Sequence, residues 1–355
     1  MFAAHRVGDN YRTMDPQQLA HAANLLYVSD DQPGFRRIPA GRGFAYLSPN
    51  GRRITSARHR RRIEALVIPP AWTDVWICRE SRGHLQATGR DDRGRKQYLY
   101  HPRWREFSNL AKFQSLERFA RALPRVRRRI DRDLRRRALT REKTSAALVA
   151  LLDTTMMRIG NEEYARSNGS FGLSTLRREH FECSRSGITL CFPGKSEREQ
   201  MVCLDDARLV RIVREYLDRE WEPVFQSLSA DSGETPAPVG SQDVNEYLRE
   251  ISGEEISAKD FRTWKATALV AGELLLGEAG DTPAKRKRQV NAAIRAAAES
   301  LGNTTTVCRK YYVHPALTDA FIEGTLQPRK SPPSPRNGFT VAETLLLSVR
   351  NVIFR

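Results

Sequence analysis

The spacing of apolar and polar residues predicts two different parts of the chain, with the change near residue 105. Before that point, short runs with a period of two, separated by turn residues, predict strands. They cover residues 44–47, 52–54, 74–80, 84–89 and 95–100. The Asn50-Gly51 pair predicts a hairpin between the first two runs. With a short helix over 15–28 and a basic helix over 55–66, we expect a small β-rich domain over residues 1–105.

After residue 105, apolar residues recur every three or four positions, which is the period of a helix with one buried face. The predicted helices cover 121–141, 145–157, a stretch that starts near 161, 206–227, 258–277 and 282–301. Residues 181–204 predict short strands, with Lys195 on a hairpin tip. The expected fold class is therefore α+β, in which a larger, mainly helical domain over 106–327 follows the β-rich domain.

The two ends of the chain and one internal stretch have the composition of irregular segments. We expect residues 1–14 to be poorly ordered and 229–241 to form a loop. Residues 328–355 form a third segment, in which a Ser- and Pro-rich linker leads to a tail helix with apolar residues at helical spacing over 339–354. The pattern leaves open whether this helix docks on the body of the protein or on a partner.

The charge of the chain predicts a polyanionic partner. Its 355 residues carry Lys+Arg 59 against Asp+Glu 42, a formal net charge of +17. Such a surplus suits nucleic acid or an anionic membrane surface. Ten arginines fall within 121–141, and we favour phosphate contact over a merely solvated helix face for them. No apolar run is long enough for a membrane span and no export signal opens the chain, so we expect a cytoplasmic protein.

Several kinds of cofactor site are excluded by the sequence. The five cysteines are scattered and odd in number, and neither they nor the seven histidines have the spacing of metal ligands, which argues against a disulfide framework and structural zinc. No phosphate-binding loop of the Gly-x-x-x-x-Gly-Lys-[Ser/Thr] type is present, which argues against a nucleotide-driven motor. We therefore expect no cofactor and no metal.

One stretch, residues 302–315, combines helix-end signals with candidate chemistry. Gly302 is placed to end a helix, and three threonines after it offer a new N-cap. Tyr311 and Tyr312 follow within a basic segment. A phenol with an ordinary pKa of about 10 is a poor nucleophile unless cations surround it. Either tyrosine is thus a candidate nucleophile towards a phosphodiester, and packing is the alternative.

Cleavage of a phosphodiester without metal also needs cations on the phosphate oxygens and an acid for the departing alcohol. The candidates, in chain order, are Arg158, Lys195, Arg262, Asn303 and a tyrosine. The segments that carry them resemble the poxvirus-type bacterial DNA topoisomerases IB over residues 25–325. The resemblance rests on Pro69-Pro70-Ala71-Trp72, Gly89-Arg90-Asp91, Arg95 to Pro102, Arg158 to Ala165, Gly172 to Leu176, Phe192-Pro193-Gly194-Lys195, Lys259-Asp260-Phe261-Arg262-Thr263, Gly302-Asn303-Thr304 and Tyr312-Val313-His314-Pro315.

The resemblance implies a role for each candidate residue. Arg158 and Arg262 correspond to the paired arginines that hold the scissile phosphate, and Lys195 to the general acid that protonates the leaving 5′-oxygen. Asn303 stands where other members carry histidine, so the implied role is a hydrogen bond to a non-bridging oxygen. Tyr312, which directly precedes Val313-His314-Pro315, corresponds to the nucleophile. Ser196 stands where some relatives have an acidic residue beside the lysine.

The implied activity is the relaxation of positive and negative DNA supercoils, through a 3′-phosphotyrosyl intermediate and strand rotation, without ATP or obligatory metal. The implied architecture is a clamp around duplex DNA. We expect a monomer associated with the nucleoid and no membrane partner. The residues expected to contact DNA are Lys96, Gln97, Tyr98, Tyr100, Gly160, Asn161, Tyr164, Thr175 and Lys259.

Two alternatives remain open. A site-specific tyrosine recombinase shares the catalytic tyrosine, but its second arginine typically follows a His-x-x-Arg pattern, whereas this chain has Lys259-x-x-Arg262. A non-enzymatic DNA-binding or architectural protein would account for the net charge alone.

Overall fold

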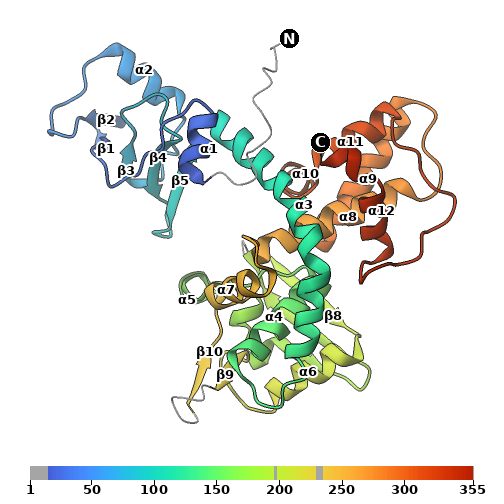
Figure 1. Ribbon diagram of the computed structural model, residues 1–355. Helices are drawn as coiled ribbons and strands as arrows, with labels where there is room; N and C mark the ends of the chain where they lie inside the picture. Colours follow the sequence, from blue (N-terminus) through green and yellow to red (C-terminus); the bar gives the residue numbers. More distant parts are fainter. Residues whose placement is uncertain (1–14, 196–197, 229–234, 355) are drawn as a thin grey trace. The chain divides into compact units, whose positions relative to one another are not determined.

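The computed structural model describes residues 15–195, 198–228 and 235–354 (Figure 1). The chain divides into two compact units, residues 1–114 and 115–355. The expected disorder of 1–14, Ser196, and part of the predicted loop over 229–241 lie outside the described residues. Within those ranges, helix and sheet are mixed and the first unit is rich in strands, as the sequence predicts.

The first unit contains an antiparallel five-stranded sheet in the order β2-β1-β3-β4-β5. Its strands are β1 (Phe35–Ala40), β2 (Gly43–Leu47), β3 (Thr73–Ile77), β4 (Leu85–Arg90) and β5 (Lys96–Tyr100). Two helices, α1 (Pro16–Ala22) and α2 (Ala57–Ala65), accompany it. Ile63 of α2 packs with Phe35, Val75 and Ile77 of the sheet in one apolar core.

The predicted hairpin across Asn50-Gly51 is shorter in the structure than the sequence predicts. The turn exists, but residues 52–54 contribute only one bridge, Leu47 to Arg53. The main partner of β2 is β1, which the sequence did not predict. The period-two pattern of β1 is hidden because Arg37 occupies an inward position. Its guanidinium is buried and donates hydrogen bonds to the carbonyls of Ile68, Pro69, Pro70 and Trp72.

The second unit is mainly helical, and it is built around the buried helix α8 (Figure 1). Its helices are the later part of α3 (Pro102–Asp133), α4 (Arg141–Thr155), α5 (Glu162–Asn168), α6 (Ala207–Leu217), α7 (Ser241–Ser252), α8 (Ala258–Leu275), α9 (Pro283–Ser300), α10 (Thr305–Tyr311), α11 (Pro315–Glu323), α12 (Val341–Ser348) and α13 (Arg350–Ile353), with the short turns η2 (Leu173–Thr175) and η3 (Arg178–His180). The strands β6 (Phe181–Cys183), β7 (Ile188–Pro193) and β8 (Glu199–Leu204) form one antiparallel sheet, and β9 (Gln226–Leu228) pairs with β10 (Pro236–Pro238).

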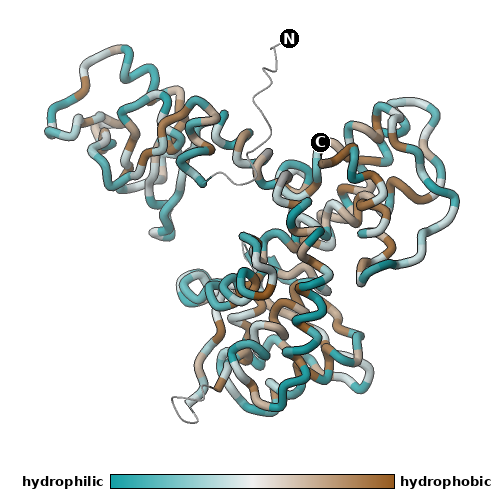
Figure 2. The backbone as a smooth tube through the Cα atoms, viewed as in Figure 1, coloured by the Kyte–Doolittle hydropathy of each residue, from teal (hydrophilic) through white to brown (hydrophobic). Residues whose placement is uncertain are grey.

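Several predicted helices have the wrong limits. The helix predicted over 15–28 ends at Ala22, and the tail helix predicted over 339–354 is divided into α12 and α13. The arginine-rich stretch 121–141 is not one helix, because α3 starts at Pro102 and ends at Asp133. The buried Asp133 carboxylate accepts from Arg129, Arg136 and the Tyr247 hydroxyl, which anchors the end of α3. The helix predicted over 206–227 ends at Leu217. It could not have continued to residue 227, because Pro223 interrupts a helix. Hydrophilic and hydrophobic residues follow one another along α3 (Figure 2).

Other predicted elements are confirmed. The helix near 161 starts with Asn161 as N-cap, 181–204 forms three strands, and Pro283 opens α9 directly after its N-cap Thr282. The tail over 339–354, whose docking partner the sequence left open, packs on the second unit through α12 against α8 and α13 against α11. None of the helices described is both long and apolar enough to cross a membrane.

Candidate active site

Arg262, in the second turn of α8, joins three helix ends. Its side chain is only 4% exposed. Nη2 donates to the carbonyl of Leu301 at 2.9 Å, just after α9, and Nη1 donates to the carbonyl of Met156, just after α4. Burial, with a smaller effect from the nearby Arg158 charge, lowers the pKa of Arg262 to about 10. The guanidinium is therefore still charged at neutral pH, and helix-end carbonyls favour that charge.

Arg158 lies on a tightly packed loop after α4. The carbonyls of Arg158 and Ile159 accept from the amides of Leu173 at 2.9 Å and Ser174 at 2.6 Å. Gly160 has a φ of 102°, in the region that favours glycine. A Cβ on Gly172 would lie 2.6 Å from the Gly160 Cα, so the two backbones touch where no side chain fits. This packing fixes the position from which Arg158 extends.

Asn303 receives a hydrogen bond from Arg158. Nη2 of the arginine donates to Oδ1 of Asn303 at 2.7 Å. The turn at Gly302, with a φ of +61°, lets the Asn303 amide donate to the carbonyl of Ala298. Nδ2 of Asn303 and Nε of Arg262 are buried donors without a hydrogen-bond partner among the described residues. Two such donors in one site fit an anionic acceptor, because unpaired buried donors are costly.

Tyr312 lies at the end of α10, next to Arg262. The guanidinium carbon is 5.4 Å from the centre of the phenol ring. Burial is the largest influence on the phenol and by itself raises its pKa. The charges of Arg262 and Arg158, and a hydrogen bond from Arg262, outweigh burial, so the pKa of Tyr312 is lowered from 10.0. Tyr311 instead lies beside Lys310, whose Nζ is 5.3 Å from its ring centre.

Thr267, one helical turn and a half beyond Arg262, fixes the backbone at Tyr312. Its hydroxyl donates to the Tyr312 carbonyl at 3.0 Å and accepts from the His314 amide at 3.3 Å. His314 caps α11 through Nδ1, which accepts from the Ala316 amide at 3.2 Å. The sequence analysis missed Thr267, because a threonine within a buried helix carries no pattern of its own.

Lys195 reaches the same site from the β7–β8 hairpin. It is exposed, and it lines a cavity of about 30 Å³ together with Arg158, Arg262 and Leu301. Gln200 of β8, which the sequence analysis also missed, lines this cavity. A Cβ on Gly302 would come 2.3 Å from Gln200 Oε1, so the hairpin and the Asn303 turn are in close contact. Four predicted residues, Arg158, Arg262, Asn303 and Tyr312, thus form one connected cluster with Lys195 at its edge.

Of the residues expected to contact DNA in the second unit, some are exposed and others are buried. Lys259 is exposed in the first turn of α8, and its charge helps to lower the pKa of Tyr312. Tyr164 is exposed on α5, for which Asn161 is the N-cap. Thr175 is buried, and its hydroxyl bonds to both the amide and the carbonyl of Gly172. Gly160 and Thr175 therefore have a clear part in supporting Arg158.

The expected DNA-contacting residues of the first unit lie together on β5. Tyr98 is 47% exposed and stacks with Tyr100 at 6.0 Å between ring centres. Lys96 pairs with Asp30 at 2.6 Å, and Gln97 donates to Asp91 at 2.8 Å on the other face of the strand. Lys96, Tyr98 and Tyr100 thus combine a cation with two aromatic rings on one face.

Half of the arginines in 121–141 are paired with carboxylates of the second unit. The paired ones are Arg121, Arg127, Arg129, Arg136 and Arg141. Phosphate contact by this stretch stays a prediction; the least exposed of these arginines, Arg127 and Arg129, are held most firmly by carboxylates. Glu117 and Asp133 lie on α3 itself, whereas the carboxylates that pair with Arg127 and Arg141 come from other elements and could not be predicted from the sequence.

Residues 101–324 match the family model for the catalytic core of eukaryotic DNA topoisomerase I. The chain belongs to the type IB DNA topoisomerases. Residues 43–91 match the N-terminal domain of bacterial DNA topoisomerase IB. The protein is therefore an isomerase that acts on DNA, and the recombinase alternative is not favoured.

Individual relatives agree with this family. A DNA topoisomerase 1B of Acanthamoeba polyphaga mimivirus is 31% identical over 285 residues, which cover 79% of this chain and 85% of the relative. DNA topoisomerase 1B of Vaccinia virus (strain Copenhagen) and DNA topoisomerase I of Monkeypox virus are each 23% identical over 260 residues, or 71% of this chain and 78% of the relative.

Proposed function

We propose that Tyr312 is the nucleophile with which this topoisomerase relaxes positive and negative supercoils. The phenol oxygen attacks a backbone phosphorus, the bond to the 5′-oxygen breaks, and a 3′-phosphotyrosyl ester forms. Strand rotation follows, and the 5′-hydroxyl attacks the ester to restore the DNA and release Tyr312. The observation that carries this assignment is the Arg262 guanidinium against the Tyr312 ring, with the lowered pKa of the phenol.

Arg158, Arg262 and Asn303 are proposed to stabilise the pentacoordinate transition state. Charge grows on the non-bridging oxygens as the phenol attacks, and donors held ready there act most strongly. The unpartnered Arg262 Nε and Asn303 Nδ2 support this role, because each is a donor already desolvated. The backbone contacts of Arg262 hold its guanidinium in place before DNA binds.

Lys195 is proposed as the general acid. The departing 5′-oxygen needs a proton, and a lysine ammonium at the edge of the site can supply it. The same amine, once neutral, can take the proton of the 5′-hydroxyl during resealing. Its position beside the cavity shared with Arg158 and Arg262 supports the assignment.

The first unit is proposed to contribute DNA contacts through the face with Lys96, Tyr98 and Tyr100, with the two units closing as a clamp on the duplex. Lys259, Tyr164 and the loop at Gly160 and Asn161 would add contacts from the second unit. The functional division into 1–105, 106–327 and 328–355 belongs to the same proposal, as do a monomeric state and a place of action at the nucleoid.

The test is relaxation of negatively and positively supercoiled plasmid, with EDTA present and ATP absent. We expect the parent to relax both, Tyr312→Phe to relax neither, and Tyr311→Phe to match the parent. Denaturing gels should show a covalent protein–DNA adduct for the parent and for Tyr311→Phe. An adduct formed by Tyr312→Phe would overturn the assignment of the nucleophile.

A further inference from the structure

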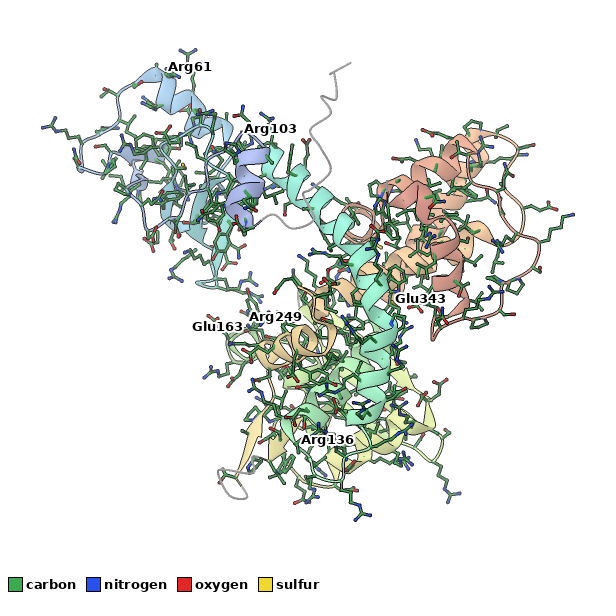
Figure 3. All side chains as sticks on the ribbon, viewed as in Figure 1. Arg61, Arg103, Arg136, Glu163, Arg249 and Glu343 are labelled. Atoms are coloured by element: carbon green, nitrogen blue, oxygen red, sulfur yellow. The ribbon has the colours of Figure 1, made fainter. Side chains whose placement is uncertain are left out.

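Four charged side chains from four different helices meet in the interior of the second unit. Arg127 of α3 pairs with Asp153 of α4 at 2.7 Å and with Glu343 of α12 at 2.9 Å. Lys265 of α8 pairs with the same two carboxylates, at 3.1 and 3.5 Å. The cluster holds two positive and two negative charges, so it is balanced. Figure 3 shows Glu343 beside the long helix α3.

Glu343 has the most confined side chain of the four. It is 0% exposed. Oε1 accepts from the indole Nε1 of Trp264 at 2.9 Å and from Arg127, and Oε2 accepts from Arg127 and from the Thr340 amide at 2.8 Å. A second contact of the same segment is the Gly338 carbonyl, which accepts from Arg127 at 2.6 Å. Each oxygen is thus fully engaged, as a buried carboxylate requires.

Glu343 contacts α8, the helix that also contains Arg262 and Thr267 of the candidate active site. On α8, Trp264 and Lys265 lie two and three residues after Arg262, and Thr267, which holds the Tyr312 carbonyl, comes two residues after Lys265. The approach of α12 is close, since a Cβ on Gly272 of α8 would lie 3.3 Å from the Ala342 Cβ. The α12 side chains Leu345 and Leu346 are also fully buried.

The same segment also reaches the element that follows Tyr312. Helix α13 packs against α11, and the ring of Phe354 lies edge-on to His314 with 6.4 Å between centres. The C-terminal segment therefore touches both the helix that presents Arg262 and the helix that starts three residues after Tyr312. It lies outside the family match, which ends at residue 324.

We propose that residues 339–354 form a brace for the active site, and that Glu343 is a positioning residue for strand cleavage. Its ion pairs and the Trp264 hydrogen bond hold α8 in the register that places Arg262 and Thr267 against Tyr312. The proposal rests on the proposed role of Tyr312. Loss of the Glu343 charge leaves Arg127 and Lys265 facing Asp153 alone, an uncompensated positive charge inside the unit, and α8 shifts to relieve it.

The test uses the full chain with Glu343→Gln, and Glu273→Gln as control. Glu273 is an exposed glutamate on α8, so its replacement changes the net charge equally without touching the cluster. Single-turnover cleavage is measured at saturating duplex DNA, using a substrate from which the short fragment that carries the new 5′-hydroxyl dissociates. A mutation far from the reacting atoms that shifts catalytic groups by about 1 Å lowers rates about 10- to 100-fold. We expect a loss of cleavage rate in this range for Glu343→Gln. Glu273→Gln should match the parent.

Two further readouts separate positioning from mere stabilisation. DNA affinity should stay within about twofold of the parent, because Glu343 lies away from the proposed DNA contacts. The midpoint of the pH–cleavage profile should rise, since Arg262 no longer favours the Tyr312 phenolate as strongly. A lower melting temperature with unchanged cleavage rate and pH midpoint would overturn the proposal and leave the tail a stabilising element only.

A second variant guards against failure to fold. Glu343→Gln combined with Lys265→Met again has one positive and one negative charge in the cluster, and the introduced amide oxygen can still accept from Trp264. We expect this double variant to recover most of the cleavage rate; absence of recovery in a folded double variant would overturn the proposal. If the proposed role of Tyr312 is itself wrong, a different experiment shows it: the Tyr312→Phe variant then still forms the covalent protein–DNA adduct.

Discussion

At the residue scale, the active site is a small set of cations and donors arranged around one phenol. Arg262 is held by two main-chain carbonyls, and Arg158 is held by its loop and by Asn303. These contacts use some donors and leave Arg262 Nε and Asn303 Nδ2 without partners among the described residues. The donors that bond to the protein hold each side chain in place, and the donors without such a partner can bond to a phosphate. Each residue therefore has a role that can be tested separately.

The first prediction concerns Asn303. We expect Asn303→Ala to lower single-turnover cleavage about 10²- to 10³-fold, the loss typical of removing one donor to a developing oxyanion. Asn291→Ala is the matched control, since Asn291 Oδ1 also accepts from an arginine, Arg309, at 2.6 Å but lies on α9 away from the cavity. Equal losses for the two variants would contradict a specific role for Asn303.

The second prediction concerns the pH dependence of cleavage. The pKa of Tyr312 is lowered from 10.0, so the rate should rise with pH along a limb whose midpoint lies below that value. Removing one positive neighbour with Lys259→Gln should move the midpoint to higher pH. Single-turnover rates measured across alkaline pH provide the test, and an unmoved midpoint would exclude Lys259 as a contributor.

The third prediction concerns His314 and acid stability. Burial lowers the pKa of His314 from 6.5 to about 4. The unfolded chain therefore takes up a proton below pH 6.5 that the folded protein does not accept until about pH 4, so stability falls as the pH falls through this window. The loss approaches roughly 3 kcal/mol at most. His314→Asn, which can still cap α11, should flatten this part of the curve in urea titrations at several pH values.

At the element scale, the site depends on contacts between segments that are far apart in the sequence. The loop at Arg158 packs on η2 through Gly160 and Gly172, and the β7–β8 hairpin meets Gly302 through Gln200. Each contact leaves no space for a side chain. Such contacts set the direction of a catalytic residue without touching the substrate.

The fourth prediction tests one of these contacts. Gly172→Ala introduces a Cβ 2.6 Å from Gly160, which forces the Arg158 loop away, and we expect both lower thermal stability and strongly reduced cleavage. Gly240→Ala is the control, because its Cβ would meet nothing closer than 3.6 Å. Melting temperatures and cleavage rates of both variants decide the matter; a Gly172→Ala protein that behaves like Gly240→Ala would exclude the close contact.

The sequence predicted much of the element order because turns and caps carry local information. Asn161, Thr282, Pro283 and Gly302 mark helix ends that the structure confirms. Strand β1 was missed because its inward Arg37 finds carbonyl partners more than thirty residues later. Thr267 and Gln200 could not be predicted for the same reason: their importance comes from tertiary contacts, and neither belongs to a motif.

At the scale of the whole molecule, charge governs the encounter with DNA. The net charge of +17 is large, although five arginines of the stretch 121–141 are engaged internally. The charge available to phosphates is therefore spread over both units rather than concentrated on one helix. Lys259 is among the exposed cations that remain, whereas Lys96 is exposed but pairs with Asp30.

The fifth prediction follows from that charge. DNA affinity should fall steeply with salt, since each phosphate neutralised by a cation releases counterions, and the decline should be linear in a plot of log K against log salt. Lys259→Gln should reduce the slope by about one contact, about 0.9 in this plot. Affinities between about 50 and 300 mM salt provide the measurement, and a flat response over that range would contradict electrostatic binding.

The hydrogen bond from Thr267 to the Tyr312 carbonyl has a mechanical consequence. If Tyr312 is the nucleophile, as proposed above, rotation of the duplex pulls on the main chain at this residue while a DNA strand is attached to it. The Thr267 hydroxyl and the cap at His314 pass that tension to α8 and α11, the two helices against which α12 and α13 pack. On that proposal, the tail would act as an anchor against torque, and the stiffness of this anchor would limit how far the phosphotyrosine drifts before the strand is resealed.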